Sequence, residues 1–229
     1  INIKIYYRPV INKEVKVEAI LAYNEDITLK KKYDEEIQKN NEYLKILYTA
    51  GIEANITLDL QELYSRNFTL LQKIVAADCI ILTSLSEDRR LIKCEGLQIK
   101  GEPLDPDTFP VIKFDETSGG PQTHAIKTGQ PFIVHDYEDW LGRSKTLMYL
   151  DTDGVRHSPD EKSTMDYKPP RSAIIIPLKY NDRVYGVLQL QSFSKGVFTD
   201  SDMYKLEPFA VLFALAMQRA MLHRKIQLE

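Results

Sequence analysis

The chain has 229 residues, of which 43% are hydrophobic and 28% are charged, and its formal net charge is −3. This length can bury a full core in one or two domains, and the composition is that of a soluble globular protein. The small negative charge excludes a general attraction to nucleic acid or to an anionic membrane, and no apolar run is long enough to span a bilayer. The cysteine content, Cys79 and Cys94, fits a reducing, cytoplasmic compartment.

Apolar and polar residues alternate at the start of the chain, as they do in strands. The alternation runs from Ile1 to Tyr7 and resumes from Val15 to Tyr23 after polar residues at 12–14, which predicts two antiparallel strands. A lone hairpin is marginally stable in water, so we expect it to pack on something outside this sequence. Because the first residue is Ile1 and not Met, we expect the sequence to be a piece of a longer protein.

A charged helix is predicted next, from Thr28 as its N-cap to Ala50, with Gly51 as the C-cap that ends it. Its possible core positions follow heptad spacing: Tyr33, Ile37, Asn40, Leu44 and Leu47. A polar residue in such a seam reduces stability but specifies register and dimeric pairing. The pattern therefore favours a parallel coiled-coil linker over a helix that is merely solvated.

The middle of the chain predicts a mixed set of short elements. We expect a helix over 59–76 that begins with a capping box at Asp59 and Glu62, and two strands over 79–85 and 91–97 joined by a turn at Glu87-Asp88. Another helix is predicted over 120–128, ended by Gly129, and a strand over 131–135. The long polar segment 137–168 follows, and loops of this length are usually functional lids or disordered.

The stretch 169–198 predicts a hairpin at the centre of the fold. Its strands run from Ala173 to Leu178 and from Val184 to Leu190, with the turn at Asn181-Asp182. The first strand is apolar in both phases, so we expect both of its faces to be covered. Thr199, with Asp202 three residues later, then forms a variant of the capping box that opens the last helix.

The last helix is predicted from Asp200 to about Gln227. It is apolar nearly all round between Leu206 and Met217. Such a helix must contact both its own sheet and a second body, and the simplest second body is the same helix of a partner subunit. We therefore expect a homodimer held through the terminal helices.

These motifs, in this order, resemble the GAF domain, a sensory module of signalling proteins. The resemblance rests on the Ile-rich strand with its Pro-Leu step, the turn, the Gly-Val-Leu-Gln-Leu strand and Phe-Thr-Asp-Ser-Asp, and it extends upstream to 55–85 and 119–136. It implies an α+β fold, a GAF-like antiparallel β-sheet of about six strands flanked by helices, here preceded by an N-terminal β-hairpin and a long linker helix.

Residues 24–28 and the charged helix after them resemble the end of a PAS domain, and the alternative is an unrelated hairpin. We expect four parts: the C-terminal hairpin of a truncated PAS-like domain at 1–28, a coiled-coil linker helix at 29–51, the GAF-like sensory domain at 52–218, and the start of a second linker helix at 219–229.

The resemblance also implies a ligand site between the sheet and the lid segment. Its candidate residues here are Thr123, His124, Asp136, Trp140, Tyr149, Arg171 and Ser172. An aromatic wall with a few polar groups suits a small-molecule cavity, and it is equally what a packed lid looks like. The identity of the ligand, and of any cofactor, stays open.

Catalytic and metal-binding motifs are not expected. The histidines at 124, 135, 157 and 223 lack the close pairing of a metal site, and neither cysteine lies in the lid, where tetrapyrrole-binding relatives attach their chromophore. The motif of cyclic-nucleotide-binding relatives is matched only by Lys195, Phe198 and Asp202, because Gln191 and Met203 replace its Asn and Glu. The string 113–116 (Lys-Phe-Asp-Glu) is a chance likeness to that motif.

A redox enzyme is the main catalytic alternative, because free methionine sulfoxide reductases share the GAF-like fold and use several cysteines. With a two-residue turn between the strands at 79–85 and 91–97, Cys79 would face Gly96 and lie diagonal to Cys94. Diagonal neighbours are about 7 to 8 Å apart, too far for an unstrained disulfide. We therefore expect both cysteines to be inert packing residues.

The sequence thus predicts a regulatory sensory module of a cytoplasmic signal-transduction protein, with no catalytic residues in this part. It would bind a small molecule, or relay a signal through dimeric linker helices, to an output domain outside this sequence such as a histidine kinase of a two-component system, a nucleotide cyclase or a phosphatase. A purely structural dimerisation and relay domain with a closed pocket is the second hypothesis. The redox enzyme is the third.

Overall fold

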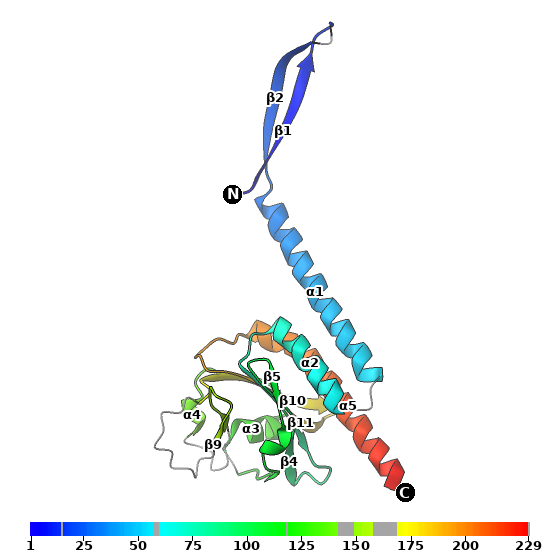
Figure 1. Cartoon of the computed structure of the whole chain (residues 1–229), viewed down its shortest axis with the longest axis vertical. Coiled ribbons are helices and arrows are strands. Elements are labelled where there is room, and N and C mark those ends of the chain that lie inside the picture. Colours follow the sequence, from blue (N-terminus) through cyan, green and yellow to red (C-terminus); the bar gives the residue numbers. More distant parts are fainter. Residues whose placement is uncertain (15, 57–59, 118, 142–148, 158–168, 229) are drawn as a thin grey trace. The chain divides into compact units, whose positions relative to one another are not determined.

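The computed structural model describes the chain except for residues 15, 57–59, 118, 142–148, 158–168 and 229 (Figure 1). Two compact units are present, Ile1–Ile46 and Leu47–Glu229. Helix α1 (Thr28–Ile56) runs through the boundary, so its last turns belong to the second unit.

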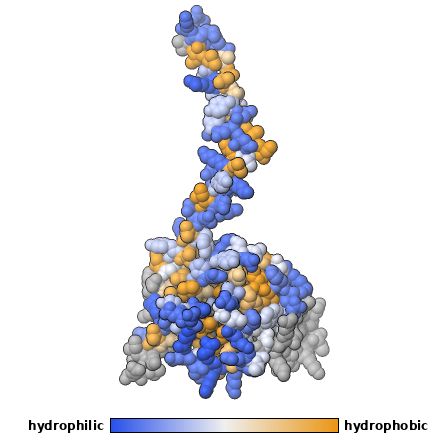
Figure 2. All heavy atoms as spheres, turned by 180° about the vertical axis from the view of Figure 1, so that it is seen from behind, coloured by the Kyte–Doolittle hydropathy of each residue, from blue (hydrophilic) through white to orange (hydrophobic). Residues whose placement is uncertain are grey.

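The first unit contains a two-stranded antiparallel sheet of β1 (Ile3–Ile11) and β2 (Val17–Asp26), with Ile3 opposite Asp26. This confirms the predicted hairpin. Apart from Tyr6, which is half-buried, every residue of both strands is exposed. Figure 2 shows hydrophobic residues at the surface along both the hairpin and the helix that follows it.

Helix α1 does not end at Gly51, so that prediction is wrong. A glycine inside a helix costs about 1 kcal/mol relative to alanine, because it loses more backbone entropy on folding. Here Ala50 and Ala54 are buried on either side of Gly51, with 0% and 8% of their surface exposed. Packing of this last part of the helix offsets the cost of the glycine, and the helix continues to Ile56.

The second unit is built on a seven-stranded antiparallel sheet, where about six strands were expected. The strand order is β5-β4-β3-β11-β10-β7, and β6 also pairs with β4. The strands are β3 (Cys79–Leu85), β4 (Leu91–Ile99), β5 (Glu102–Leu104), β6 (Ile112–Lys113), β7 (Phe132–Val134), β10 (Ser172–Tyr180) and β11 (Arg183–Ser192). β10 and β11 are interior strands, as the apolar run predicted.

The turns decide the register of the two long hairpins. Asn181 and Asp182 both have positive φ, which matches the twist of a two-residue turn and confirms the turn between β10 and β11. The link between β3 and β4 comprises residues 86–90, so it is longer than the predicted two-residue turn. The hydroxyl of Ser86 accepts a hydrogen bond from the amide of Leu91 across this link, and the pairing of the two strands has a bulge at Leu82/Thr83. The predicted alignment of this hairpin is therefore wrong.

Helices and a small hairpin cover the two faces of the sheet. On one face lie α2 (Leu60–Ile74) and α5 (Asp200–Leu228), and the ring of Phe68 in α2 rests on Gly96. The predicted cap of α2 at Asp59 lies outside the described residues. The opposite face, here called the lid face, is covered by α3 (Pro121–Thr128) and by β8 (Tyr149–Leu150) paired with β9 (Arg156–His157). The short elements α4 (Glu138–Leu141) and η1 (Pro106–Thr108) complete the unit.

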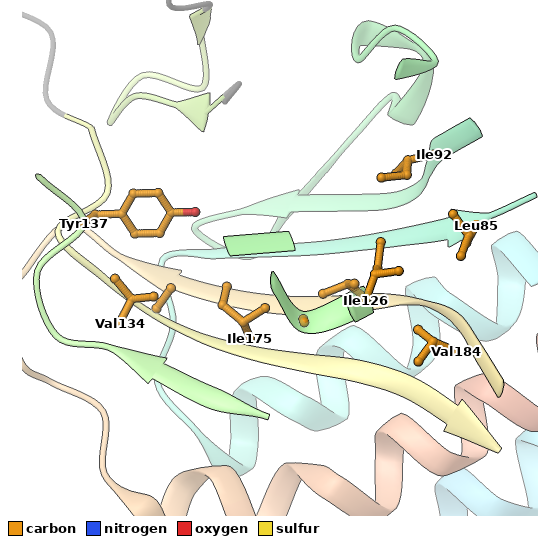
Figure 3. Packing of buried hydrophobic residues seen from close by; sticks show 10 residues of the cluster. Leu85, Ile92, Ile126, Val134, Tyr137, Ile175 and Val184 are labelled. Atoms are coloured by element: carbon orange, nitrogen blue, oxygen red, sulfur yellow. The ribbon is translucent and has the colours of Figure 1, made fainter. Parts of the chain in front are cut away.

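The lid face carries two hydrophobic clusters. One joins α3 to the sheet, and Figure 3 shows it extending from Tyr137 at one end to Leu85 and Val184 at the other. The second joins the β8–β9 hairpin to β3 and β4 through Leu150, which packs with Cys79 and Cys94. Both elements that cover the lid face are thus anchored by buried apolar side chains.

Helix α5 begins as predicted. The amide of Thr199 donates to the carboxylate of Asp202 at 3.0 Å, and the amide of Asp202 donates back to the hydroxyl of Thr199 at 3.3 Å. The large side chains Phe209 and Phe213 are buried within the chain itself. The helix is not covered on all sides, because Val211 is 44% exposed.

Candidate functional site

Two of the predicted site residues meet in an aromatic cluster beside α3. The ring of His124 lies 5.8 Å from that of Trp140 in α4, and both pack on Phe132 of β7, which stacks on Trp140 at 5.5 Å. His124 is exposed and Trp140 is half-buried. The cluster therefore forms a rim of the lid face.

Tyr149 lies in the β8–β9 hairpin, where it is buried and stacks on His157 with ring centroids 5.5 Å apart. Asp151 organises this hairpin. One of its carboxylate oxygens accepts the amides of Asp153 and Val155, each at 2.9 Å, and the other lies 2.7 Å from Nε2 of His157. An Asp that binds amides just after it is a common turn device, so the Asp-Thr-Asp-Gly string was the available signal for this turn.

The electrostatics of Asp151 reflect two opposing effects. Burial favours its neutral form, while the hydrogen bonds from His157 and from the amides of Val155 and Asp153 favour the carboxylate. The hydrogen bonds prevail, so the pKa of Asp151 lies below its ordinary value. The hairpin is thus closed around an ionised carboxylate.

Thr123 is buried in α3. The other three predicted residues lie around the start of β10, on both sides of the sheet. Asp136 forms an ion pair with Lys195, which joins the segment after β7 to the one after β11. The backbone of Arg171 pairs with Ser192 and Tyr137. Ser172 is fully buried. Successive side chains of a strand point to opposite faces of the sheet, and the next residue, Ala173, belongs to the lid-face cluster. Ser172 therefore lies on the helix-covered face. The structure therefore separates Ser172 from His124, Trp140 and Tyr149.

The partial match to a cyclic-nucleotide motif has a structural explanation here. Lys195 is held by Asp136, Phe198 is buried at the entry to α5, and Asp202 caps that helix. Each of the three side chains has a partner or a packing role within the chain.

Buried polar side chains form the floor of the lid face, and most of them were missed from the sequence. Gln191 is 1% exposed and donates from Nε2 to the hydroxyl of Tyr137 at 3.3 Å. Thr83 accepts a hydrogen bond of 2.6 Å from Gln122 of α3. Gln189, two residues before Gln191 in β11, is also buried. Two glutamines in one phase of an apolar strand were the signal that could have found this floor.

The described floor residues are neutral. Burial raises the pKa of Tyr137, so its hydroxyl stays protonated and keeps a proton to donate. The Oε1 atom of Gln191 is buried and has no hydrogen-bond partner among the described residues. A donor and an acceptor side by side suit an uncharged polar molecule, because neither Gln191 nor Tyr137 offers a charge that would replace the hydration of a charged one.

The cysteines have no reactive setting. Both are free and buried, and burial is the main cause that raises the pKa of each thiol to about 12. Cys79 lies opposite Ile99, and Cys94 lies opposite Thr83, so they are not the diagonal neighbours that were expected. Among the described residues, no three side chains of His, Cys, Asp or Glu converge as a metal site requires.

Comparisons with known proteins identify the fold. The GAF domain family model matches residues 57–218. The GAF domain of a phosphoenolpyruvate-protein phosphotransferase from Acinetobacter is 13% identical, with a TM-score of 0.60 over 78% of this chain and 94% of that one. Its counterpart from Coxiella burnetii is 16% identical, with a TM-score of 0.60 over 80% and 97%.

An enzyme shares the fold as well. The free methionine-R-sulfoxide reductase from Neisseria meningitidis, solved with its substrate, is 16% identical, with a TM-score of 0.54 over 79% of this chain and 91% of that one. No curated protein matches the sequence significantly. None of the helices in the described ranges combines the length and hydrophobicity of a membrane span. The family match contains the whole seven-stranded sheet, the elements of the lid face, α2 and most of α5, and the chain therefore belongs to the GAF domain family, a regulatory and sensory fold.

Proposed function

We propose that this chain is the sensory module of a cytoplasmic signal-transduction protein. It binds a small uncharged molecule on the lid face and passes the signal through its terminal helices to an output domain. The buried floor carries this proposal, because Gln191 offers a buried acceptor beside the hydroxyl of Tyr137. No catalytic role is assigned to any residue. The two free cysteines support a reducing compartment.

The parts of the chain follow from this role. We assign 1–28 to the end of a PAS-like domain, 29–51 to a linker helix, 52–218 to the GAF module and 219–229 to the start of a second linker. The exposed apolar residues of β1 and β2 support the first assignment, because a two-stranded sheet needs a covering layer to be stable.

A purely structural relay domain is the second candidate, and the burial of Thr123 and Tyr149 favours it. Where side chains already pack against one another, a ligand has less exposed protein surface to cover. A redox enzyme is the third candidate. The fold that the chain shares with the sulfoxide reductases supports it, but the burial of both thiols opposes it.

Retention of a small molecule separates the first candidate from the second. We expect native mass spectrometry of the purified chain to show an additional bound mass, and Gln191→Leu to weaken its retention about tenfold or more, because a buried hydrogen bond is lost. Gln98→Leu is the matched control, since Gln98 is 6% exposed but lies on the helix-covered face. A wild-type protein that carries no additional mass from any cell extract would favour the structural relay.

The surface of α5 supports assembly through the terminal helices. Its partly or fully exposed residues step by four and three along one stripe, as in a two-stranded coiled coil. The stripe comprises Tyr204, Pro208, Val211, Leu215, Gln218 and Leu222. A groove of about 730 Å³ between α5 and the edge of β10 adjoins the stripe and is lined by Tyr204 and Val211. We propose a parallel homodimer in which two such stripes pair.

Val211→Glu tests this assembly. We expect the variant to stay folded and to raise the dimer dissociation constant roughly a hundredfold or more, because two carboxylates would be buried against each other. Sedimentation at several concentrations measures the change. Val197→Glu is the control, since Val197 has the same 44% exposure as Val211 but lies outside the stripe. Unchanged dimerisation in both variants would show that α5 is not the interface.

A further inference from the structure

The C-terminal end of α1 obtains its cap from a distant residue. The last carbonyl groups of a helix have no partner within it, and they carry partial negative charge. No basic residue lies in the last turn of α1. Instead, Nη1 of Arg219, 165 positions later in α5, donates a hydrogen bond of 2.8 Å to the carbonyl oxygen of Ala54.

We propose that Arg219 is a clamp that couples the incoming helix α1 directly to the outgoing helix α5. This rests on the proposed relay function and adds a route for it that does not pass through the lid face. A hydrogen bond tolerates only a narrow range of lengths, so a rotation or slide of α5 that exceeds the reach of the Arg219 side chain must move the last turn of α1 or break the bond.

The local packing explains how an arginine reaches this carbonyl. Ala50 and Ala54 are small and buried, so no large side chain from these positions shields the backbone. The guanidinium group holds several donors in a fixed plane, which keeps an oriented contact that an ammonium group does not. Arg219 directly follows Gln218 of the exposed α5 stripe, so a rotation of α5 that changes the pairing of that stripe would also move Arg219.

Hydrogen exchange of the whole chain tests the clamp. In Arg219→Gln we expect the amides of residues 53–56 to exchange about tenfold faster, because a charge-assisted hydrogen bond to the helix end is lost. Arg219→Lys keeps the charge, and we expect a smaller acceleration. Arg183→Gln is the matched control, because Arg183 donates to the carbonyl oxygen of Glu87 at 3.1 Å, away from α1. We expect it to leave residues 53–56 unchanged.

A double-mutant cycle tests the coupling itself. Apart from the neighbouring backbone of α1 itself, no atom of the described residues lies within 4 Å of a Cβ added at Gly51, so Gly51→Ala strengthens α1 locally. With Arg219 present, we expect this change to slow exchange of amides 216–223 in α5 several-fold, since coupling between two sites is reciprocal. In the Arg219→Gln background we expect no slowing.

Two results would overturn the clamp. One is equal exchange of residues 53–56 in the wild type and Arg219→Gln, and the other is the same effect of Gly51→Ala on α5 in both backgrounds. Neither result bears on the retained small molecule or on the dissociation constant of Val211→Glu. Failure of the clamp is therefore distinguishable from failure of the proposed function.

Discussion

Gly186→Ala is expected to lower the free energy of unfolding by about 3 kcal/mol or more, because the added methyl group meets backbone that cannot move aside. Gly186 lies in β11, opposite Ser84 of β3. A Cβ built there would stand 1.9 Å from the carbonyl oxygen of Thr83 and 3.1 Å from the Cα of Ser84. The two strands would have to separate in the middle of the sheet.

Urea unfolding of the variant measures this effect, and Gly51→Ala provides the control. The same substitution meets open space at Gly51, where we expect it to raise the free energy of unfolding by about 0.5 to 1 kcal/mol. If the free energy of unfolding falls in Gly186→Ala and rises in Gly51→Ala, the close approach of the neighbouring backbone, and not the entropy of glycine, is the reason that residue 186 must be glycine. A loss below about 1 kcal/mol in Gly186→Ala would mean that β3 and β11 yield easily.

Features that depend on a few neighbouring residues were readable from the sequence. The turn at Asn181 and Asp182, the cap formed by Thr199 and Asp202, and the end of α3 at Gly129 all have the geometry that those residue types favour. In each case the chain segment satisfies its own hydrogen bonds or backbone conformation. Local chemistry is enough to specify such positions.

Three other features were not predicted correctly, and only the first depends on distant partners. Gly51 looks like a helix end, but buried neighbours and Arg219 extend α1 beyond it. The alignment of β3 with β4 depends on the hydroxyl of Ser86 and on a bulge. Alternation along β10 places Ser172 on the helix-covered face, a distinction that the family resemblance alone did not make. At Gly51 tertiary contacts override a local preference. The turn at Ser86 and the alternation of β10 are local features that the sequence predictions did not use.

Two of the residues predicted for the site lie close together, and their role in binding stays a prediction. The aromatic rim of His124 and Trp140 was expected, because aromatic residues in a lid segment are conspicuous. The two glutamines in one phase of β11 could have indicated a polar floor, but not the partner that a buried glutamine needs from another segment. For Gln191 that partner is Tyr137, 54 residues earlier, and no spacing rule connects the two. This floor now defines the chemistry of the proposed ligand.

The thiols of Cys79 and Cys94 are expected to react with iodoacetamide at pH 8 roughly a thousandfold more slowly in the native chain than in the unfolded one, because burial lowers the thiolate fraction and blocks access. Burial raises the pKa of each thiol to about 12, and the residues are 1% and 4% exposed. Val155→Cys is the positive control, since Val155 is 54% exposed in the lid-face hairpin and its replacement should react nearly as fast as an unfolded thiol.

Mass spectrometry of the labelled chain assigns each rate to its cysteine. The same experiment weighs the redox alternative, because a catalytic thiol must attack its substrate as a thiolate. Replacing both cysteines with alanine should lower the free energy of unfolding by up to a few kcal/mol through lost packing. We expect this replacement to remove no catalytic activity. Fast native alkylation of Cys79 or Cys94, joined to a methionine sulfoxide reductase activity that disappears when that cysteine is replaced, would make this chain an enzyme and not a sensor.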